Sequence, residues 1–163
     1  MQETAIQDLY ADELAVCYGC GRLNEHGLKI KSVWEGEECV ARFQPEKYHT
    51  GIAGFVYGGL IASLLDCHGI GTAAAAACRA RNLDPAETSI PRYVTAALHV
   101  DFLRPTPIDG VLEIRGRAVE IKDRKVVVEL MLLAHGKECA RGSVVAVRMP
   151  ERMNPLQSTG AEK

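Results

Sequence analysis

Residues 50–78, TGIAGFVYGGLIASLLDCHGIGTAAAAAC, decide the fold of this chain. From Tyr57 onward the stretch is rich in leucine and alanine, which predicts one long helix over about residues 57–79. The stretch carries a single formally charged side chain, Asp66. Burying an unpaired acid costs several kcal/mol, and packing alone seldom explains such a cost. We therefore predict a catalytic or ligand-binding role for Asp66.

Strand-like segments lie on both sides of this helix. Residues 28–34 and 38–43 alternate in side-chain character around the turn residues Glu35 and Gly36, which predicts a hairpin. Four more strand-like runs follow the helix, at residues 93–103, 111–121, 125–134 and 138–148. Two strands, a long helix and four further strands predict an α+β domain in which an antiparallel sheet wraps one buried helix.

The chain, residues 1–163, has the length of a single domain. Its first part, residues 1–16, reads as a short leading helix or arm that is anchored by Ile6, Leu9, Leu14 and Val16. Its last part, residues 150–163, reads as a loose polar tail.

Composition excludes several classes of partner. The formal net charge is -2 and the lysines and arginines are scattered, so we expect no nucleic acid partner. Six glycines, His68 and Asp66 interrupt residues 50–78, which indicates a buried helix of a soluble protein rather than a membrane span. The sequence opens Met1-Gln2-Glu3 without a basic segment and an apolar run, so we expect reduced cysteines and a cytoplasmic location.

The helix presents two kinds of surface. At about 100° per residue, one narrow stripe collects mostly small residues around the acid: Gly59, Ala62, Ser63, Asp66, Ile70 and Ala73. Such a stripe lets another surface come close. The remaining surface carries leucine and isoleucine that would pack against the sheet: Leu60, Ile61, Leu64 and Leu65. His68 points about 160° away from Asp66, so we interpret it as a core residue and not as a catalytic partner.

The start of the helix is a candidate oxyanion site. Backbone N–H groups are unpaired there, and a ligand oxygen could approach them closely at Gly58 and Gly59, although the glycines could equally serve only a tight turn and close packing. Gly58 and Asp66 are eight residues apart, about 12 Å along a helix axis, too far to act on one carbonyl. Two antiparallel helices across a two-fold axis would bring the amides of one chain to the acid of the other.

These residues resemble a known family, the hotdog-fold acyl-CoA thioesterases, in particular the branch of the phenylacetate-pathway and 4-hydroxybenzoyl-CoA thioesterases. The resemblance runs from about residue 17 to 148. It rests on three segments: CYGCG at residues 17–21 with Gly27-Leu28, the Gly58-Gly59 pair with Asp66, and VDFLRP at residues 100–105.

The resemblance implies roles for these residues. The Gly58 amide would polarise the thioester carbonyl, with Gly59 beside it, and Asp66 of the other subunit would act as general base on water or as nucleophile. It further implies an acyl-CoA substrate with coenzyme A as part of the substrate, no separate cofactor, and a homodimer or a dimer of dimers. Many relatives have histidine before the glycine pair, where this chain has Tyr57. A phenol can still donate a hydrogen bond to the substrate.

Three further residues are candidate substrate contacts. His49 could reach the site from the glycine-rich loop, or it is an ordinary loop histidine. Ser63, one turn before Asp66, could orient the carboxylate or a water, or it is a small packing residue. Arg104 could pair with a phosphate of coenzyme A, or it is a surface charge at the end of a strand.

The cysteines predict no metal site and no cysteine nucleophile. Cys17-x-x-Cys20 resembles a metal knuckle, but no second pair of this kind supplies the remaining ligands. Cys67 has no base placed near it by the local sequence. The sequence thus favours a thioester hydrolase; a non-hydrolytic acyl-CoA or small-ligand binding protein remains the alternative, with a dehydratase or hydratase third, since His68 points away from Asp66.

Overall fold

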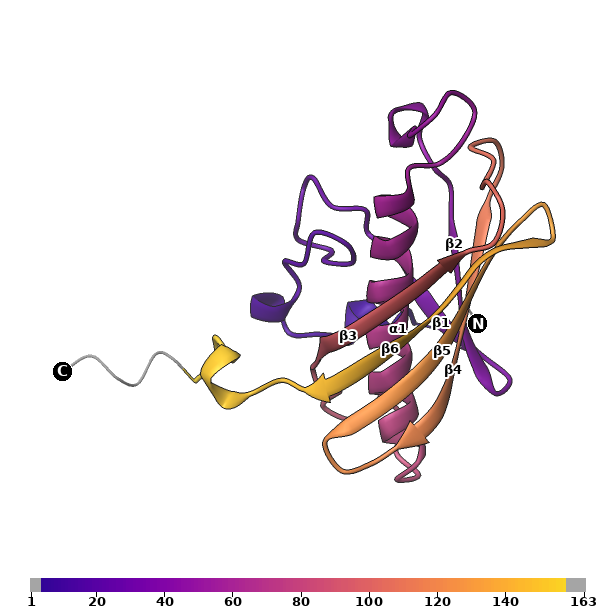
Figure 1. Ribbon diagram of the computed structural model, residues 1–163. Helices are drawn as coiled ribbons and strands as arrows, with labels where there is room; N and C mark the ends of the chain where they lie inside the picture. The colour runs from indigo at the N-terminus through magenta and orange to yellow at the C-terminus, as the bar shows by residue number, and fades with distance from the viewer. Residues whose placement is uncertain (1–3, 158–163) are drawn as a thin grey trace.

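One long helix, α1, lies across a six-stranded antiparallel sheet in the computed structural model, which describes residues 4–157 (Figure 1). The helix spans Gly58–Arg79. The strands are β1 Ser32–Glu35, β2 Glu38–Phe43, β3 Tyr93–Phe102, β4 Leu112–Ile121, β5 Lys125–Ala134 and β6 Lys137–Arg148. Their order in the sheet is β1-β2-β4-β5-β6-β3, so β3 crosses to the far edge and pairs only with β6.

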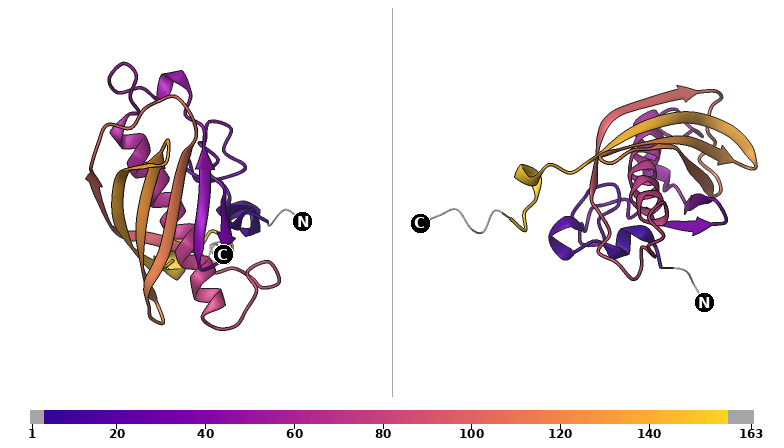
Figure 2. Two further views of the ribbon diagram at one scale, coloured as in Figure 1. Left: turned by 90° about the vertical axis from the view of Figure 1, so that its right-hand side faces the viewer. Right: turned by 90° about the horizontal axis from the view of Figure 1, so that it is seen from below.

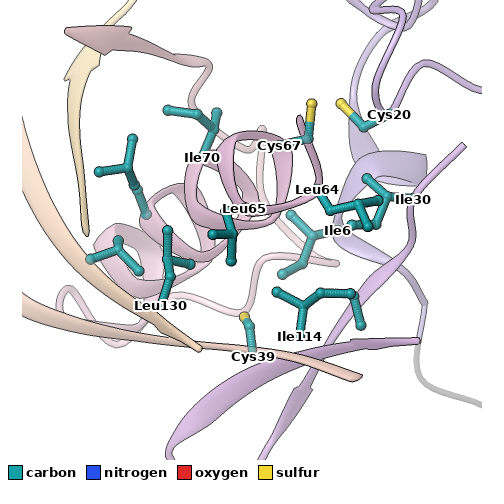
Figure 3. Close-up of a cluster of buried hydrophobic side chains, with 14 of the residues drawn as sticks. Ile6, Cys20, Ile30, Cys39, Leu64, Leu65, Cys67, Ile70, Ile114 and Leu130 are labelled. Atoms are coloured by element: carbon teal, nitrogen blue, oxygen red, sulfur yellow. The ribbon is translucent and has the colours of Figure 1, made fainter. Parts of the chain in front are cut away.

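The helix is covered from two sides. Seen from below in Figure 2, α1 lies with the sheet on one side and the N-terminal residues on the other. In the close-up of Figure 3, Leu65 lies on the side that faces Leu130 and Cys39 of the sheet, whereas Leu64 lies beside Ile6 and Ile30. The prediction that the apolar helix residues face the sheet therefore holds for part of them, and the N-terminal segment buries the others.

Most of α1 is buried, which explains its composition. Leu64, Leu65 and the alanines Ala73–Ala75 are fully enclosed, and the small alanines let the strands approach the second half of the helix closely. By length and composition alone α1 could cross a membrane, but burial inside this fold identifies it as the core helix.

The predicted strands agree with the structure to within one residue except the first. Residues 28–31 are not paired in the sheet: Lys29 has a positive φ of 54°, and the amides of Leu28 and Ile30 donate to the carbonyls of Tyr18 and Gly19. The predicted strand 28–34 is therefore wrong in its first half, because these residues pair with the loop before them.

The terminal segments are short 3-10 turns rather than a helix. The N-terminal turns are η1 Ile6–Leu9 and η2 Asp12–Leu14; Ile6 is buried, but Val16 is exposed, so its predicted anchoring role is wrong. The predicted C-terminal tail contains one turn, η4 Glu151–Met153. Residues 1–3 and 158–163 of the predicted arm and tail lie outside the described residues.

A buried polar chain connects the N-terminal segment, the hairpin and α1. Gln7 Nε2 donates to Ser32 Oγ at 2.9 Å, Ser32 Oγ lies 2.8 Å from His68 Nδ1, and His68 Nε2 lies 3.1 Å from the Cys39 carbonyl oxygen. The chain is satisfied when His68 is neutral, with Ser32 donating to Nδ1 and Nε2–H donating to Cys39. His68 is fully buried, which confirms the prediction of a core histidine.

Candidate active site

The start of α1 is fixed by the loop before it. Tyr57 is the N-cap residue, with φ -61° and ψ 130°, and its amide donates to the His49 carbonyl at 2.8 Å. The amide of Val56 donates to the Thr106 carbonyl at 2.9 Å, which ties the loop to the segment after β3. Among residues 4–157 no acceptor takes the amides of Gly58 or Gly59, so both are available to a ligand oxygen.

The two glycines serve different purposes. A Cβ atom at Gly59 would lie 2.3 Å from Cε1 of the Tyr57 ring, so the exposed ring folds over Gly59 and a larger residue there would displace it. A Cβ atom at Gly58 would meet only the Phe102 ring, at an ordinary 3.5 Å. Packing within the chain therefore explains Gly59 but not Gly58, which favours a ligand-related role for Gly58.

The predicted substrate contacts His49 and Arg104 lie toward the same end of α1. The His49 ring is engaged locally: its Nδ1 accepts the amide of Glu46 at 2.9 Å, and the ring stacks edge-on against Tyr48. Arg104 follows the end of β3, is exposed, and forms no ion pair with any residue in the range 4–157. The Arg104 guanidinium is therefore exposed, with Glu138 as a nearby charge, whereas His49 has a structural hydrogen bond.

Asp66 lies two turns into α1, half-buried, and receives a hydrogen bond from the sheet. Thr95 Oγ1 of β3 donates to Asp66 Oδ1 at 2.5 Å. A β-bulge interrupts the pairing of β3 with β6 between Thr95 and Ala97. Bulges of this kind re-aim side chains near functional sites. The edge strand thus holds the carboxylate in one orientation.

Burial is the main influence on the pKa of the Asp66 carboxyl. Loss of solvent raises the pKa of the Asp66 carboxyl above its usual range, and the charge of the nearby Cys17 acts in the same direction. The Thr95 hydrogen bond and the charge of Arg92 oppose the rise in pKa. A carboxylate with a raised pKa is a better proton acceptor, as a general base requires.

The small-residue stripe is open only over the first half of α1. Gly59, Ala62, Ser63 and Asp66 are half-buried, whereas Ile70 and Ala73 are buried inside the chain. Beyond Asp66 the stripe is therefore covered by the chain itself, and only its first half remains accessible. Ser63 Oγ donates to the Gly59 carbonyl at 2.8 Å, one turn back, so its proton is not directed at Asp66.

One chain does not bring the two halves of the site together. Gly58 and Asp66 stay on one helix, about 12 Å apart along its axis. Two of the hollows on the described surface are one on the outer face of the sheet beside Arg115 and His99, and one near Arg81 and Tyr93 at the end of α1. Neither hollow is lined by Gly58 or Asp66.

Sequence reasoning missed Thr95 and Phe102. Period-two alternation from the buried Tyr93 places Thr95 on the inward face of β3, so a polar residue in that register was an available signal. No local signal identifies Phe102 as the neighbour of Gly58, because the contact joins residues 44 positions apart.

Comparison with known families supports the resemblance. Residues 53–140, just over half of the chain, match the model of the family described as the thioesterase superfamily. Comparison with curated proteins gave no match.

Solved structures show the same architecture. A thioesterase superfamily protein from Shewanella loihica PV-4 is 52% identical, with 78% of this chain and 96% of that chain covered and a TM-score of 0.63. The PaaI protein of the Escherichia coli phenylacetic acid degradation operon is 16% identical, with coverages of 76% and 81% and a TM-score of 0.61. A Streptococcus mutans UA159 protein solved with acetyl CoA is 17% identical, with coverages of 78% and 96% and a TM-score of 0.61.

The last two similarities concern the fold, whereas the family match and the Shewanella protein also match this chain in sequence. The long helix against a six-stranded antiparallel sheet confirms the predicted hotdog architecture. This chain therefore belongs to the thioesterase superfamily.

Proposed function

We propose that this protein is an acyl-CoA thioesterase whose active site forms between two copies of the chain. The observation that carries the proposal is the orientation of Asp66, a half-buried carboxylate with a raised pKa that Thr95 of the edge strand holds in place. The unpartnered amides at Gly58 and Gly59 supply the second requirement of the chemistry, donors for a developing oxyanion.

The reaction uses one water and no separate cofactor. Asp66 takes a proton from water, the oxygen attacks the thioester carbonyl carbon, and the Gly58 amide of the other subunit stabilises the oxyanion. The C–S bond then breaks, the carboxylic acid is released, and the thiolate of coenzyme A takes up the proton. Asp66 acting as nucleophile would instead form an anhydride that water hydrolyses.

The open edge of the sheet supports a homodimer. β3 has a neighbour on one side only, and its residues 95–99 are exposed on both faces. Leu98, Phe102 and Leu103 add exposed apolar side chains to this edge. A ten-residue edge with apolar side chains favours pairing with another strand, and a two-fold axis there would place the α1 helices of two copies side by side.

Coenzyme A is the part of the substrate that the comparisons support. A protein of the same fold was solved with acetyl CoA. Arg104, exposed toward the Gly58 end of α1, is suited to pair with a phosphate of coenzyme A, and Tyr57 and His49 lie at the same end. Six free cysteines fit the cytoplasm, where acyl-CoA is available. The dimers could associate further into a dimer of dimers.

Release of coenzyme A from a panel of acyl-CoAs, followed by chromatography, tests the proposal. Wild-type protein should turn over at least one member of the panel, and Asp66→Asn should lose most of the activity while still binding substrate. Absence of turnover with every acyl-CoA, or an Asp66→Asn variant as active as the wild type, would refute the enzyme assignment.

A single turnover in ¹⁸O-labelled water separates the two roles of Asp66. If Asp66 is the general base, the new oxygen of the carboxylic acid is ¹⁸O. If Asp66 is the nucleophile and water attacks the aspartyl carbonyl of the anhydride, the first product carries unlabelled oxygen from the carboxylate.

A non-hydrolytic acyl-CoA binding protein is the second candidate. The position of Tyr57 favours it, because the exposed phenol ring covers Gly59 where many relatives carry histidine. This function predicts tight binding of acyl-CoA, without thiol release, by both the wild type and Asp66→Asn.

A further inference from the structure

Three cysteines from two distant segments meet beside Asp66. The Sγ atoms of Cys17, Cys20 and Cys67 all lie within 4.8 Å of one another. Figure 3 shows the sulfur atoms of Cys20 and Cys67 facing each other across the gap between α1 and the N-terminal loop. Thioester hydrolysis as proposed above uses none of these thiols, so the cluster requires its own explanation.

The spacing of the sulfur atoms fits a tetrahedral metal site. Sulfur ligands at about 2.3 Å from a zinc ion lie about 3.8 Å apart along the edge of the tetrahedron. Cys17 Sγ and Cys67 Sγ are 3.8 Å apart. The pair therefore already has the separation that two thiolate ligands of Zn²⁺ adopt.

The loop that carries Cys17 and Cys20 is built to hold this arrangement. Gly21 N donates to the Cys17 carbonyl at 2.7 Å, which closes a tight turn. A Cβ atom at Gly19 would lie 2.3 Å from Cys67 Sγ, so only glycine lets the Cys67 sulfur reach the turn. A Cβ atom at Gly21 would lie 2.4 Å from the Cys17 amide nitrogen. The approach of the Cys67 sulfur thus explains Gly19, whereas the backbone of the loop itself explains Gly21.

Arg92 supplies a positive charge near Cys17 and Cys20. Three thiolates and Zn²⁺ sum to one negative charge, which the half-buried guanidinium of Arg92 can balance. Arg92 also lies over the ring of Tyr10, 4.5 Å from its centroid.

We propose that Cys17, Cys20 and Cys67 form a three-thiolate site that binds one Zn²⁺ ion per chain. Protons on the thiols pass to solvent as the ion binds. The ion ties the N-terminal loop to α1 next to the candidate catalytic acid. This inference does not depend on the proposed hydrolase activity, since a binding protein could carry the same site.

Cobalt and zinc titration of the full-length, reduced and chelator-treated protein tests the site. We expect one Co²⁺ per chain, with thiolate-to-cobalt charge-transfer absorption and the strong visible bands of a tetrahedral site, and stoichiometric displacement by Zn²⁺. Cys17→Ser should weaken binding by more than about 100-fold, beyond the loss typical of outer-shell changes. The matched controls Cys78→Ser and Cys139→Ser remove buried thiols outside the cluster and should bind as the wild type does.

A second measurement keeps the test valid if a variant folds poorly. In the wild-type protein, Zn²⁺ should protect Cys17, Cys20 and Cys67 from alkylation, as mapped by mass spectrometry, and leave the reactivity of the other three thiols unchanged. Absence of stoichiometric binding, unchanged affinity in Cys17→Ser, or binding of Cu⁺ but not Zn²⁺ would each overturn the assignment. Formation of a disulfide within the cluster that Zn²⁺ does not prevent would overturn it as well.

Discussion

Gly58 is the residue whose role can be tested most cleanly. It occupies the first position of α1, where proline is tolerated, and the extended backbone of Tyr57 suits a residue that precedes proline. Gly58→Pro removes the N–H that the proposed oxyanion needs, whereas Gly58→Ala keeps it and adds a Cβ that meets only the Phe102 ring at 3.5 Å. We expect kcat to fall about 10²–10³-fold in Gly58→Pro and to fall far less in Gly58→Ala.

Steady-state kinetics and thermal unfolding of the two variants check this expectation. Both should melt close to the wild type, since neither substitution removes a hydrogen bond made within the chain. Equal activity in the two variants would show that the Gly58 amide does not act on the substrate.

We expect the buried His68 to lower the free energy of unfolding in mild acid. Burial lowers the pKa of His68 from 6.5 to about 4. Between these values the unfolded chain binds a proton that the folded chain does not, so the free energy of unfolding falls as the pH drops from 6.5 toward 4. The full loss amounts to about 3 kcal/mol.

Urea unfolding of the wild type and His68→Gln across this pH range measures the effect. Glutamine can accept from Ser32 and donate to Cys39 but does not titrate, so its stability should depend less steeply on pH. Parallel pH profiles of the two proteins would show that His68 is not the titrating group.

Strand β3 carries a residue that positions the catalytic acid, Thr95. The bulge after Thr95 aims its hydroxyl at Asp66, and hydrogen bonds to charged groups contribute about 1.5–3 kcal/mol. Thr95→Val keeps the shape and removes the hydroxyl, so kcat should fall roughly 10- to 100-fold with little change in KM. Thr95→Ser keeps the donor and should restore most of the rate. A serine variant as slow as the valine variant would point to packing instead of hydrogen bonding.

The same elements show what the sequence can predict. Strands 38–43 and 125–134 have the predicted bounds because alternation and turn residues are local signals. The break at Lys29 escaped prediction because it depends on hydrogen bonds to Tyr18 and Gly19. The sequence does not indicate the thiol cluster at Cys67, because its sulfur neighbour Cys17 lies 50 positions away. Contacts of that range follow from the packing of α1, which no spacing rule encodes.

The proposed site combines residues of two subunits, so it can be tested by mixing two inactive variants. Asp66→Asn and Gly58→Pro should each be nearly inactive alone. In a mixed dimer one site combines the intact Gly58 of the first variant with the intact Asp66 of the second, and the other site carries both changes. After random reassociation of equal amounts, half of the dimers are mixed and have one working site, so about a quarter of the wild-type activity should return.

The measurement compares the activity of the mixture with the activity of each variant alone. A mixture no more active than its components, after exchange of subunits has been verified by mass, would place both groups in one chain or exclude the dimeric site. An equal mixture of the wild type with the double variant serves as the reference for exchange.

The position of β3 at the edge also affects how the chain folds during its synthesis. Its neighbour β6 is translated last, so β3 leaves the ribosome with nothing to pair with until about residue 148 has followed. The apolar helix ahead of it remains partly uncovered over the same interval, a period in which nascent chains are prone to aggregate. We infer that the strand through which two copies would join is the last to be incorporated, so assembly must wait until β6 has been made.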